Sequence, residues 1–196
     1  MMEILAALEA SGYAMFVKES NTAYVSILAW HSIGMAFLVG ISGATALRVL
    51  GVARSLPLAP MEDFFPLMYA GFWINAATGV VLLTLYPSKF LVDVVFYIKL
   101  GAIVAAVVII RRLAAQVFRD EASLDTEAGA KRAKRLAGTL LAVWLVAVTA
   151  GRLTAYSFDT RVQTATAVLI VTVLMLLVGY GAARLLGWIR SSRQGV

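Results

Sequence analysis

The chain has 196 residues, of which 61% are hydrophobic and 14% are charged, and its mean hydropathy is +0.87. Soluble domains are roughly 45–50% apolar and about 25% charged, so this composition excludes an ordinary water-soluble domain. The chain has no cysteine and one histidine, His31. These counts exclude disulfides, thiolate metal sites and any metal site that needs two histidines from one chain.

The first predicted element is a short N-terminal helix over residues 2–17. Its apolar side chains fall on one helical face: Ile4, Leu5, Leu8, Met15 and Phe16. Such a pattern predicts a helix that lies in the membrane interface, and a frayed tail is the alternative. The segment begins Met-Met-Glu with no basic region, so we do not expect a signal peptide.

Five membrane-spanning helices follow, because a span needs about 20 mostly apolar residues. The segments that qualify are residues 22–47, 64–86, 90–110, 136–158 and 164–188. The tight turn Tyr86-Pro87-Ser88 separates the second span from the third, with Ser88 as the expected N-cap. The predicted fold is all-α. It is a polytopic five-helix membrane bundle, one domain over residues 1–196, with an interfacial N-terminal helix.

The orientation follows from the basic residues. Residues 111–135 form the one long polar connection, which we expect to continue as exposed helix. With five spans, twelve Lys and Arg residues fall on one side of the membrane and four on the other. Because Lys and Arg gather in cytoplasmic loops, the N-terminus is predicted outside and both loop 111–135 and the C-terminus in the cytoplasm. Anionic headgroups explain the net charge of +6, without nucleic acid.

Four spans each carry one polar residue at a similar depth: His31, Asn75, Lys99 and Arg152. Polar groups at membrane depth are costly, so each is a functional hypothesis. Gly34 lies one turn after His31 and would leave room for a flat ring. Trp30 would wall the same space. The sequence therefore predicts an outward-facing polar pocket formed by these six residues.

Each of these residues also has a structural alternative. Arg152 could extend to the outer interface, whereas His31 and Asn75 could simply hydrogen-bond neighbouring helices. Tryptophans such as Trp30 could fill the bundle core. Stripes of small residues at a spacing of four predict close helix packing: Ser32, Ala36, Gly40 and Ala44 in the first span, and Gly71, Asn75 and Gly79 in the second.

A redox membrane subunit that binds haem b or a quinone is the first functional hypothesis. His31 would be the metal ligand, because imidazole ligates haem iron, and Arg152 would pair with a propionate. A second axial ligand would have to come from another chain. A quinone would instead need only hydrogen bonds, which His31, Lys99 and Asn75 could make.

Two other functional classes stay open. A non-catalytic scaffold or accessory subunit would use the small-residue stripes for packing and would bind lipid, copies of itself or other membrane subunits. A small oligomeric transporter would use the cationic core. No phosphate-binding loop, zinc-protease motif or serine-hydrolase motif occurs in the chain, so the sequence does not assign catalysis.

Several segments resemble an uncharacterised bacterial inner-membrane family of four or five helices. They are Ala29-Trp30-His31-Ser32-Ile33-Gly34, Gly40-Ile41-Ser42-Gly43, Phe72-Trp73-Ile74-Asn75-Ala76-Ala77-Thr78-Gly79, Tyr97-Ile98-Lys99-Leu100 and Thr149-Ala150-Gly151-Arg152-Leu153. That family is loosely similar to copper-resistance-D-like and cytochrome-b561-like proteins, whose first helix carries a histidine in a similar setting. The resemblance covers about residues 23–156. It implies a bacterial inner-membrane location and a site near His31, but the cytochromes use several histidines and only His31 has a counterpart here.

Overall fold

The structure is a computed structural model that describes residues 2–156 and 158–185. The described residues form helices and turns without a strand, which confirms the predicted all-α fold. The helices are α1 (Met2–Glu9), α2 (Gly12–Glu19), α3 (Asn21–Val49), η1 (Ala59–Phe64), α4 (Phe65–Leu85), α5 (Pro87–Phe90), α6 (Val94–Phe118), α7 (Glu121–Leu124), α8 (Glu127–Leu153) and α9 (Phe158–Leu185).

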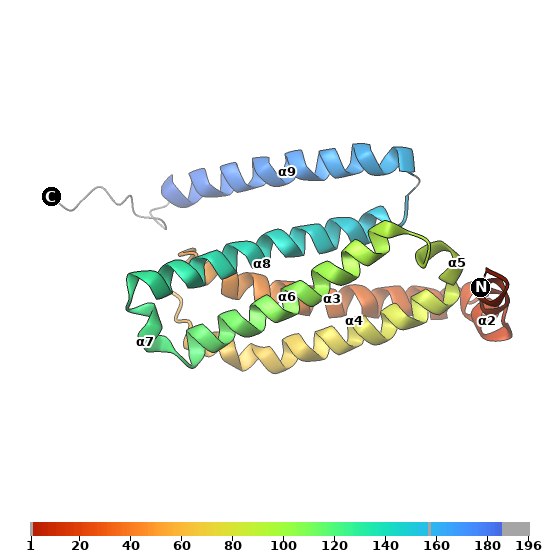
Figure 1. Ribbon diagram of the computed structural model, residues 1–196, viewed down its shortest axis with the longest axis horizontal. Coiled ribbons are helices and arrows are strands. Elements are labelled where there is room, and N and C mark those ends of the chain that lie inside the picture. Colours follow the sequence, from red (N-terminus) through yellow and green to blue (C-terminus); the bar gives the residue numbers. More distant parts are fainter. Residues whose placement is uncertain (1, 157, 186–196) are drawn as a thin grey trace.

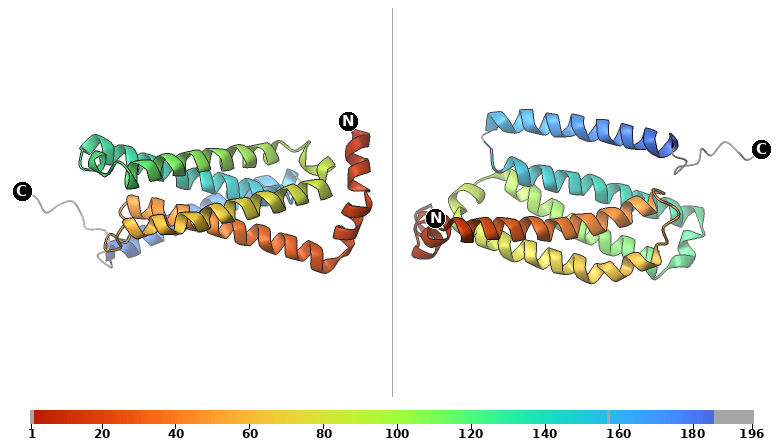
Figure 2. Two further views of the ribbon diagram at one scale, coloured as in Figure 1. Left: turned by 90° about the horizontal axis from the view of Figure 1, so that it is seen from below. Right: turned by 180° about the vertical axis from the view of Figure 1, so that it is seen from behind.

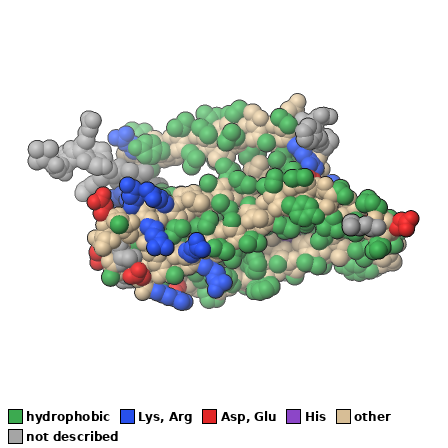
Figure 3. All heavy atoms as spheres, viewed as in Figure 1, with side chains coloured by type: hydrophobic (Ala, Val, Ile, Leu, Met, Phe, Trp, Pro, Cys, Tyr) green, Lys and Arg blue, Asp and Glu red, His purple; other side chains and the backbone are tan. Residues whose placement is uncertain are grey.

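Within the described ranges, five helical segments are long and apolar enough to cross a membrane: α3, η1 with α4, α6, α8 and α9. Even the shortest, α6 with 25 residues, is about 38 Å long at 1.5 Å per residue, which exceeds a hydrocarbon core of about 30 Å. Hydrophobic side chains cover the length of these helices on the face shown in Figure 3, whereas Lys and Arg gather near α7.

The third long helix starts four residues later than predicted. Asp93 is its N-cap, and its Oδ1 accepts a hydrogen bond from the Val95 amide at 3.0 Å. Ser88, the expected cap, instead donates a hydrogen bond to Glu9. Pro87 starts the separate one-turn helix α5, where its missing N–H does no harm.

Most of the polar connection over residues 111–135 is helical, as the sequence predicted. Helix α6 continues to Phe118, and α8 already begins at Glu127, after the N-cap Thr126. Helix α8 ends at Leu153, five residues before the predicted end of the fourth span. The fifth helix starts at Phe158 and is described to Leu185, so predicted residues 186–188 lie outside the described part.

The N-terminal segment forms two short helices instead of one. Ser11 breaks it, because its side chain accepts a hydrogen bond from the Ala14 amide at 3.3 Å and caps α2. Helices α1 and α2 contact α4, and α1 also contacts α5. Both lie across one end of the bundle instead of along it (Figure 2). At this end of the bundle, Ala14 and Val17 of α2 are buried against Leu85 of α4.

Four helices, α3, α4, α6 and α8, make the packed body, and α9 runs beside α8 (Figure 1). The main core joins side chains from all four helices, among them Leu38, Met68, Ile110 and Leu140. Trp144 is buried here, and its indole N–H donates to the hydroxyl of Ser42 at 2.9 Å. Trp144 therefore fills the bundle core, the structural role that the sequence left open for tryptophans within the spans.

The small-residue stripe predicted for the first span does not mediate packing between the described helices. All four of its members are exposed: Ser32, Ala36, Gly40 and Ala44. The buried face begins two residues later, at Gly34, which is about 200° around the helix. Gly34 and Gly71 determine which face of α3 is buried, because they let the backbones of α3 and α4 come into contact. A Cβ built on Gly34 would lie 2.7 Å from the Gly71 carbonyl oxygen.

Candidate functional site

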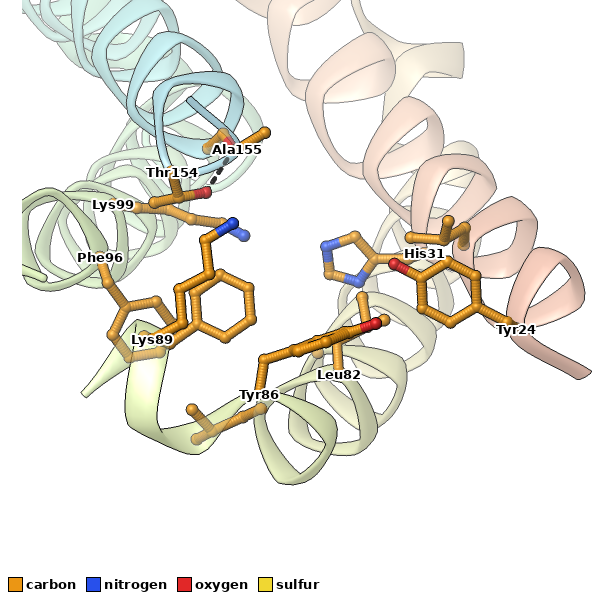
Figure 4. Close-up of a pocket in the computed structure, with 14 residues that line it drawn as sticks. Tyr24, His31, Leu82, Tyr86, Lys89, Phe96, Lys99, Thr154 and Ala155 are labelled. Atoms are coloured by element: carbon orange, nitrogen blue, oxygen red, sulfur yellow. Dashed lines mark hydrogen bonds between the residues drawn. The ribbon is translucent and has the colours of Figure 1, made fainter. Parts of the chain in front are cut away.

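A cavity of about 480 Å³ opens among α3, α4, α5, α6 and the end of α8 (Figure 4). It lies towards the end of the bundle that α1 and α2 cross. Its lining is mostly apolar and aromatic, with a few basic and hydroxyl groups. The lining residues are Tyr24, Leu28, His31, Gly79, Leu82, Leu83, Tyr86, Lys89, Phe90, Phe96, Lys99, Gly151, Thr154 and Ala155.

His31 forms one wall of the cavity and is half-buried. Its ring Nδ1 lies 2.9 Å from the Thr78 hydroxyl on α4. The side-chain amide of Asn75 donates to the His31 backbone carbonyl at 2.8 Å. Gly79 leaves room for the imidazole, since a Cβ built on it would meet His31 Cε1 at 3.4 Å. Helix α4 thus fixes both the backbone and the ring of His31.

Lys99 forms the opposite wall, and its stem lies against Gly151, where an added Cβ would lie 3.5 Å from Lys99 Cε. Lys89 from α5 also points its ammonium group into the cavity towards His31 (Figure 4). Among the described residues, neither ammonium group has a hydrogen-bond or ion-pair partner, and no carboxylate lines the cavity. The cavity lining therefore carries two basic side chains and no acidic one, and Asp93, outside the lining, interacts electrostatically with Lys89.

Aromatic rings complete the walls. Tyr24 and Tyr86 meet edge to face, with ring centroids 6.5 Å apart. The ring centroids of Phe90 and Phe96 lie 5.7 Å apart, and Phe96 lies on the side nearer Lys99 (Figure 4). Burial, with smaller effects of Tyr24 and Glu9, raises the pKa of the Tyr86 phenol; even an ordinary tyrosine, with a pKa of about 10, keeps its hydroxyl proton at neutral pH. Such walls suit a flat ring that carries hydrogen-bond acceptors.

The structure brings together only part of the predicted pocket. His31 and Lys99 both line the cavity, on opposite sides. Asn75 is 7% exposed and lies behind His31, where it joins α3 to α4. It supports the site without facing the cavity.

The other three predicted residues lie outside the cavity lining. Gly34 does not clear space for a ligand, because the α4 backbone at Gly71 occupies that space. Trp30 is 55% exposed on the outer face of α3. Arg152 is exposed, with its guanidinium 5.5 Å from the centroid of the Tyr156 ring. Its neighbour Gly151 lines the cavity instead, since one residue turns a helix by about 100°.

Sequence reasoning missed Thr78, Lys89 and the two tyrosines. Thr78 lies three residues after Asn75, a spacing that places both on one helical face, so it could have been found. Lys89 and Tyr86 sit at a span end, where lysine and tyrosine are common for lipid reasons. Their position in the chain gave no separate signal.

Among the described residues, no group of three His, Cys, Asp or Glu side chains could hold a metal ion. Comparison with protein families, curated proteins and solved structures finds no match for the chain. The resemblance to copper-resistance-D-like and cytochrome-b561-like proteins therefore stays a prediction, and the cavity itself carries the functional argument.

Proposed function

We propose that the chain is an integral subunit of a redox assembly in a bacterial inner membrane and that its cavity binds a quinone. The five long apolar helices support membrane insertion. The Lys and Arg residues near α7 support a cytoplasmic location for that end. The cavity then lies in the outer half of the bundle, beneath α1 and α2, which rest at the outer interface.

The observation that carries this proposal is the pairing of two ammonium groups with an imidazole across an aromatic cavity that lacks a carboxylate. Lys89 and Lys99 can donate hydrogen bonds to the carbonyl oxygens of a quinone. The ring can stack among Tyr86, Phe90 and Phe96. Because the cavity is lined by long lipid-facing helices, an isoprenoid tail can remain in the bilayer.

A bound quinone would supply a two-electron, two-proton couple. The residues of this chain bind it and orient it. Lys99 holds one oxygen from α6, and His31, fixed by Thr78, faces the ring from α3. The mostly apolar walls strengthen these hydrogen bonds, because such bonds are stronger in surroundings of low polarity. Electron donors and acceptors would belong to partner subunits, and the lipid-exposed surface of α9 offers an apolar face to such a partner.

Haem b suits the same cavity less well. The described cavity offers one imidazole, His31, and Lys99 stands opposite it. Arg152, the residue expected to pair with a propionate, lies outside the lining. We therefore expect the detergent-purified protein to show no haem bands after reduction with dithionite.

A titration of the purified protein with a decyl-substituted benzoquinone tests this function. Quenching of the intrinsic tryptophan fluorescence reports binding. We expect one saturable site per chain, and we expect an excess of decylbenzene, which has the same tail but no carbonyl groups and does not itself quench, to leave quinone binding unchanged. Quenching that does not saturate, or that decylbenzene relieves, would refute specific quinone binding.

A further inference from the structure

The hydroxyl of Thr78 determines which nitrogen of His31 carries the proton. Its Oγ1 lies 2.6 Å from the Ile74 carbonyl oxygen and 3.1 Å from that of Asn75. A threonine hydroxyl has one proton to donate and two lone pairs that accept. Two oxygens at 2.6 Å repel each other unless a proton lies between them, so Thr78 donates its proton within its own helix.

The hydrogen bond between Thr78 and His31 can then have only one direction of donation. Since the Thr78 hydroxyl donates to a carbonyl, its oxygen accepts at the 2.9 Å contact, and His31 Nδ1 is the donor. In a neutral imidazole, the hydrogen bond made by one ring nitrogen determines whether the other nitrogen carries a proton. A neutral His31 with its proton on Nδ1 has a bare lone pair on Nε2.

That lone pair faces the cavity. The Nδ1–Cε1 edge of the ring lies against α4 at Gly79, and Figure 4 shows the other nitrogen on the side facing Lys99. The two ammonium groups of Lys89 and Lys99 point the same way, towards the imidazole. The mostly apolar lining and the Lys99 ammonium opposite disfavour a charge on the ring, so a neutral ring with Nε2 as an acceptor fits this cavity.

We infer that the cavity is selective for a hydroxylated ring, the reduced quinol form of its ligand, with His31 Nε2 accepting the ligand O–H and Lys99 donating to the opposite oxygen. This inference rests on the proposed function and adds the redox form that the site prefers. A quinone carbonyl cannot donate to Nε2 and leaves that lone pair unsatisfied, which costs binding free energy.

Isotope labelling tests the tautomer directly, because His31 is the only histidine in the chain. Protein grown with ¹⁵N-histidine gives one pair of imidazole nitrogen signals. We expect Nδ1 to be protonated and Nε2 to be bare at neutral pH. Thr78→Val removes the acceptor, and we expect the preference for Nδ1–H to be lost. A proton on Nε2 in the wild-type protein would overturn the inference.

Ligand binding tests the selectivity. The probes are a decyl benzoquinol, its di-O-methyl ether and the parent quinone, with the quinol kept reduced by ascorbate. We expect the quinol to shift the Nε2 signal and to bind about tenfold more tightly than its ether. We expect His31→Phe to remove that difference.

The outcomes separate the two claims. If neither quinol nor quinone binds a saturable site, the proposed function fails. If the quinone binds but the quinol and its ether bind equally, or if His31→Phe leaves their difference intact, the inference alone fails and the proposed function stands.

Discussion

At the scale of single residues, the ionisable side chains within the long apolar helices divide into those that line the cavity and those that face outward. His31 and Lys99 were predicted as site residues because their charge or polarity is costly at membrane depth. Both line the cavity. Arg152 met the same criterion but faces outward beside Tyr156, because depth along a helix does not fix the direction of a side chain. Thr78 was missed because threonine is ordinary within an apolar helix.

Another residue pair that the sequence did not indicate joins α9 to the start of α6. Arg161 binds the Asp93 carboxylate through both terminal nitrogens, at 2.9 and 2.7 Å. It also donates to the Tyr156 carbonyl at 2.9 Å. The Asp93 side chain is only 8% exposed. Two residues 68 positions apart cannot be paired from sequence spacing, so this contact required the structure.

This pair predicts a pH-dependent contribution to stability. Burial alone would raise the pKa of Asp93, but Arg161 and the Val95 amide outweigh it and hold the pKa below its usual value. The contribution is therefore complete above the unfolded-state pKa of about 3.9 and is lost as the pH falls through the lower folded-state value. We expect Asp93→Asn to cost about 2 kcal/mol near neutral pH and progressively less as the pH falls below about 3.9.

Thermal unfolding in detergent, followed by circular dichroism, measures this effect. Asp63→Asn is the matched control, because Asp63 is an exposed carboxylate on η1. The gap in Tm between wild type and Asp93→Asn should close on acidification. A gap that stays constant from about pH 7 to about pH 3 would show that the carboxylate charge is not what Arg161 recognises.

At the scale of helices, the existence of each long helix followed from hydropathy, whereas the packing faces did not. Helix α3 is apolar all round, so hydrophobicity does not distinguish its lipid side from its buried side. The predicted stripe on α3 was on the wrong face for this reason. The side-chain cap Asp93 also places the start of α6 several residues later than the hydropathy pattern does, because a cap competes locally with the span pattern.

The contact between α3 and α4 predicts a sharp difference between two glycines. A Cβ on Gly71 would lie 2.7 Å from the Gly34 carbonyl oxygen, whereas a Cβ on Gly40 meets nothing within 4 Å. We expect Gly71→Ala to lower stability by about 1–3 kcal/mol, because two backbones must separate. Gly40→Ala should leave stability unchanged or raise it by up to about 1 kcal/mol.

Thermal unfolding of the two alanine variants in the same detergent is the measurement. The comparison is matched, because both substitutions add one methyl group to a helical glycine. A similar loss of stability in both variants would mean that the close approach of α3 and α4 contributes nothing specific.

At the scale of the whole molecule, the arrangement separates a basic end near α7 from the cavity end near α1 and α2. The proposed orientation puts the basic end in the cytoplasm. The number of long apolar helices and this charge asymmetry could be predicted from the sequence. The cavity could not, because it depends on how five separate helices meet.

The absence of native cysteine makes this orientation easy to test. Val92→Cys, at a position 65% exposed near the cavity end, should react with a membrane-impermeant thiol reagent in intact cells. Ser55→Cys, exposed in the loop between α3 and η1, should react only after lysis. Reaction of Ser55→Cys but not Val92→Cys in intact cells would reverse the orientation.

The most direct test of the central claim compares quinone affinity in two variants that each lose one cation from the same part of the bundle. Lys99→Met removes the ammonium group inside the cavity, and Arg152→Met removes the exposed guanidinium outside it. Titration with decyl benzoquinone should show affinity about tenfold weaker in Lys99→Met and unchanged in Arg152→Met. Equal affinity in Lys99→Met and the wild type would contradict a quinone site in this cavity.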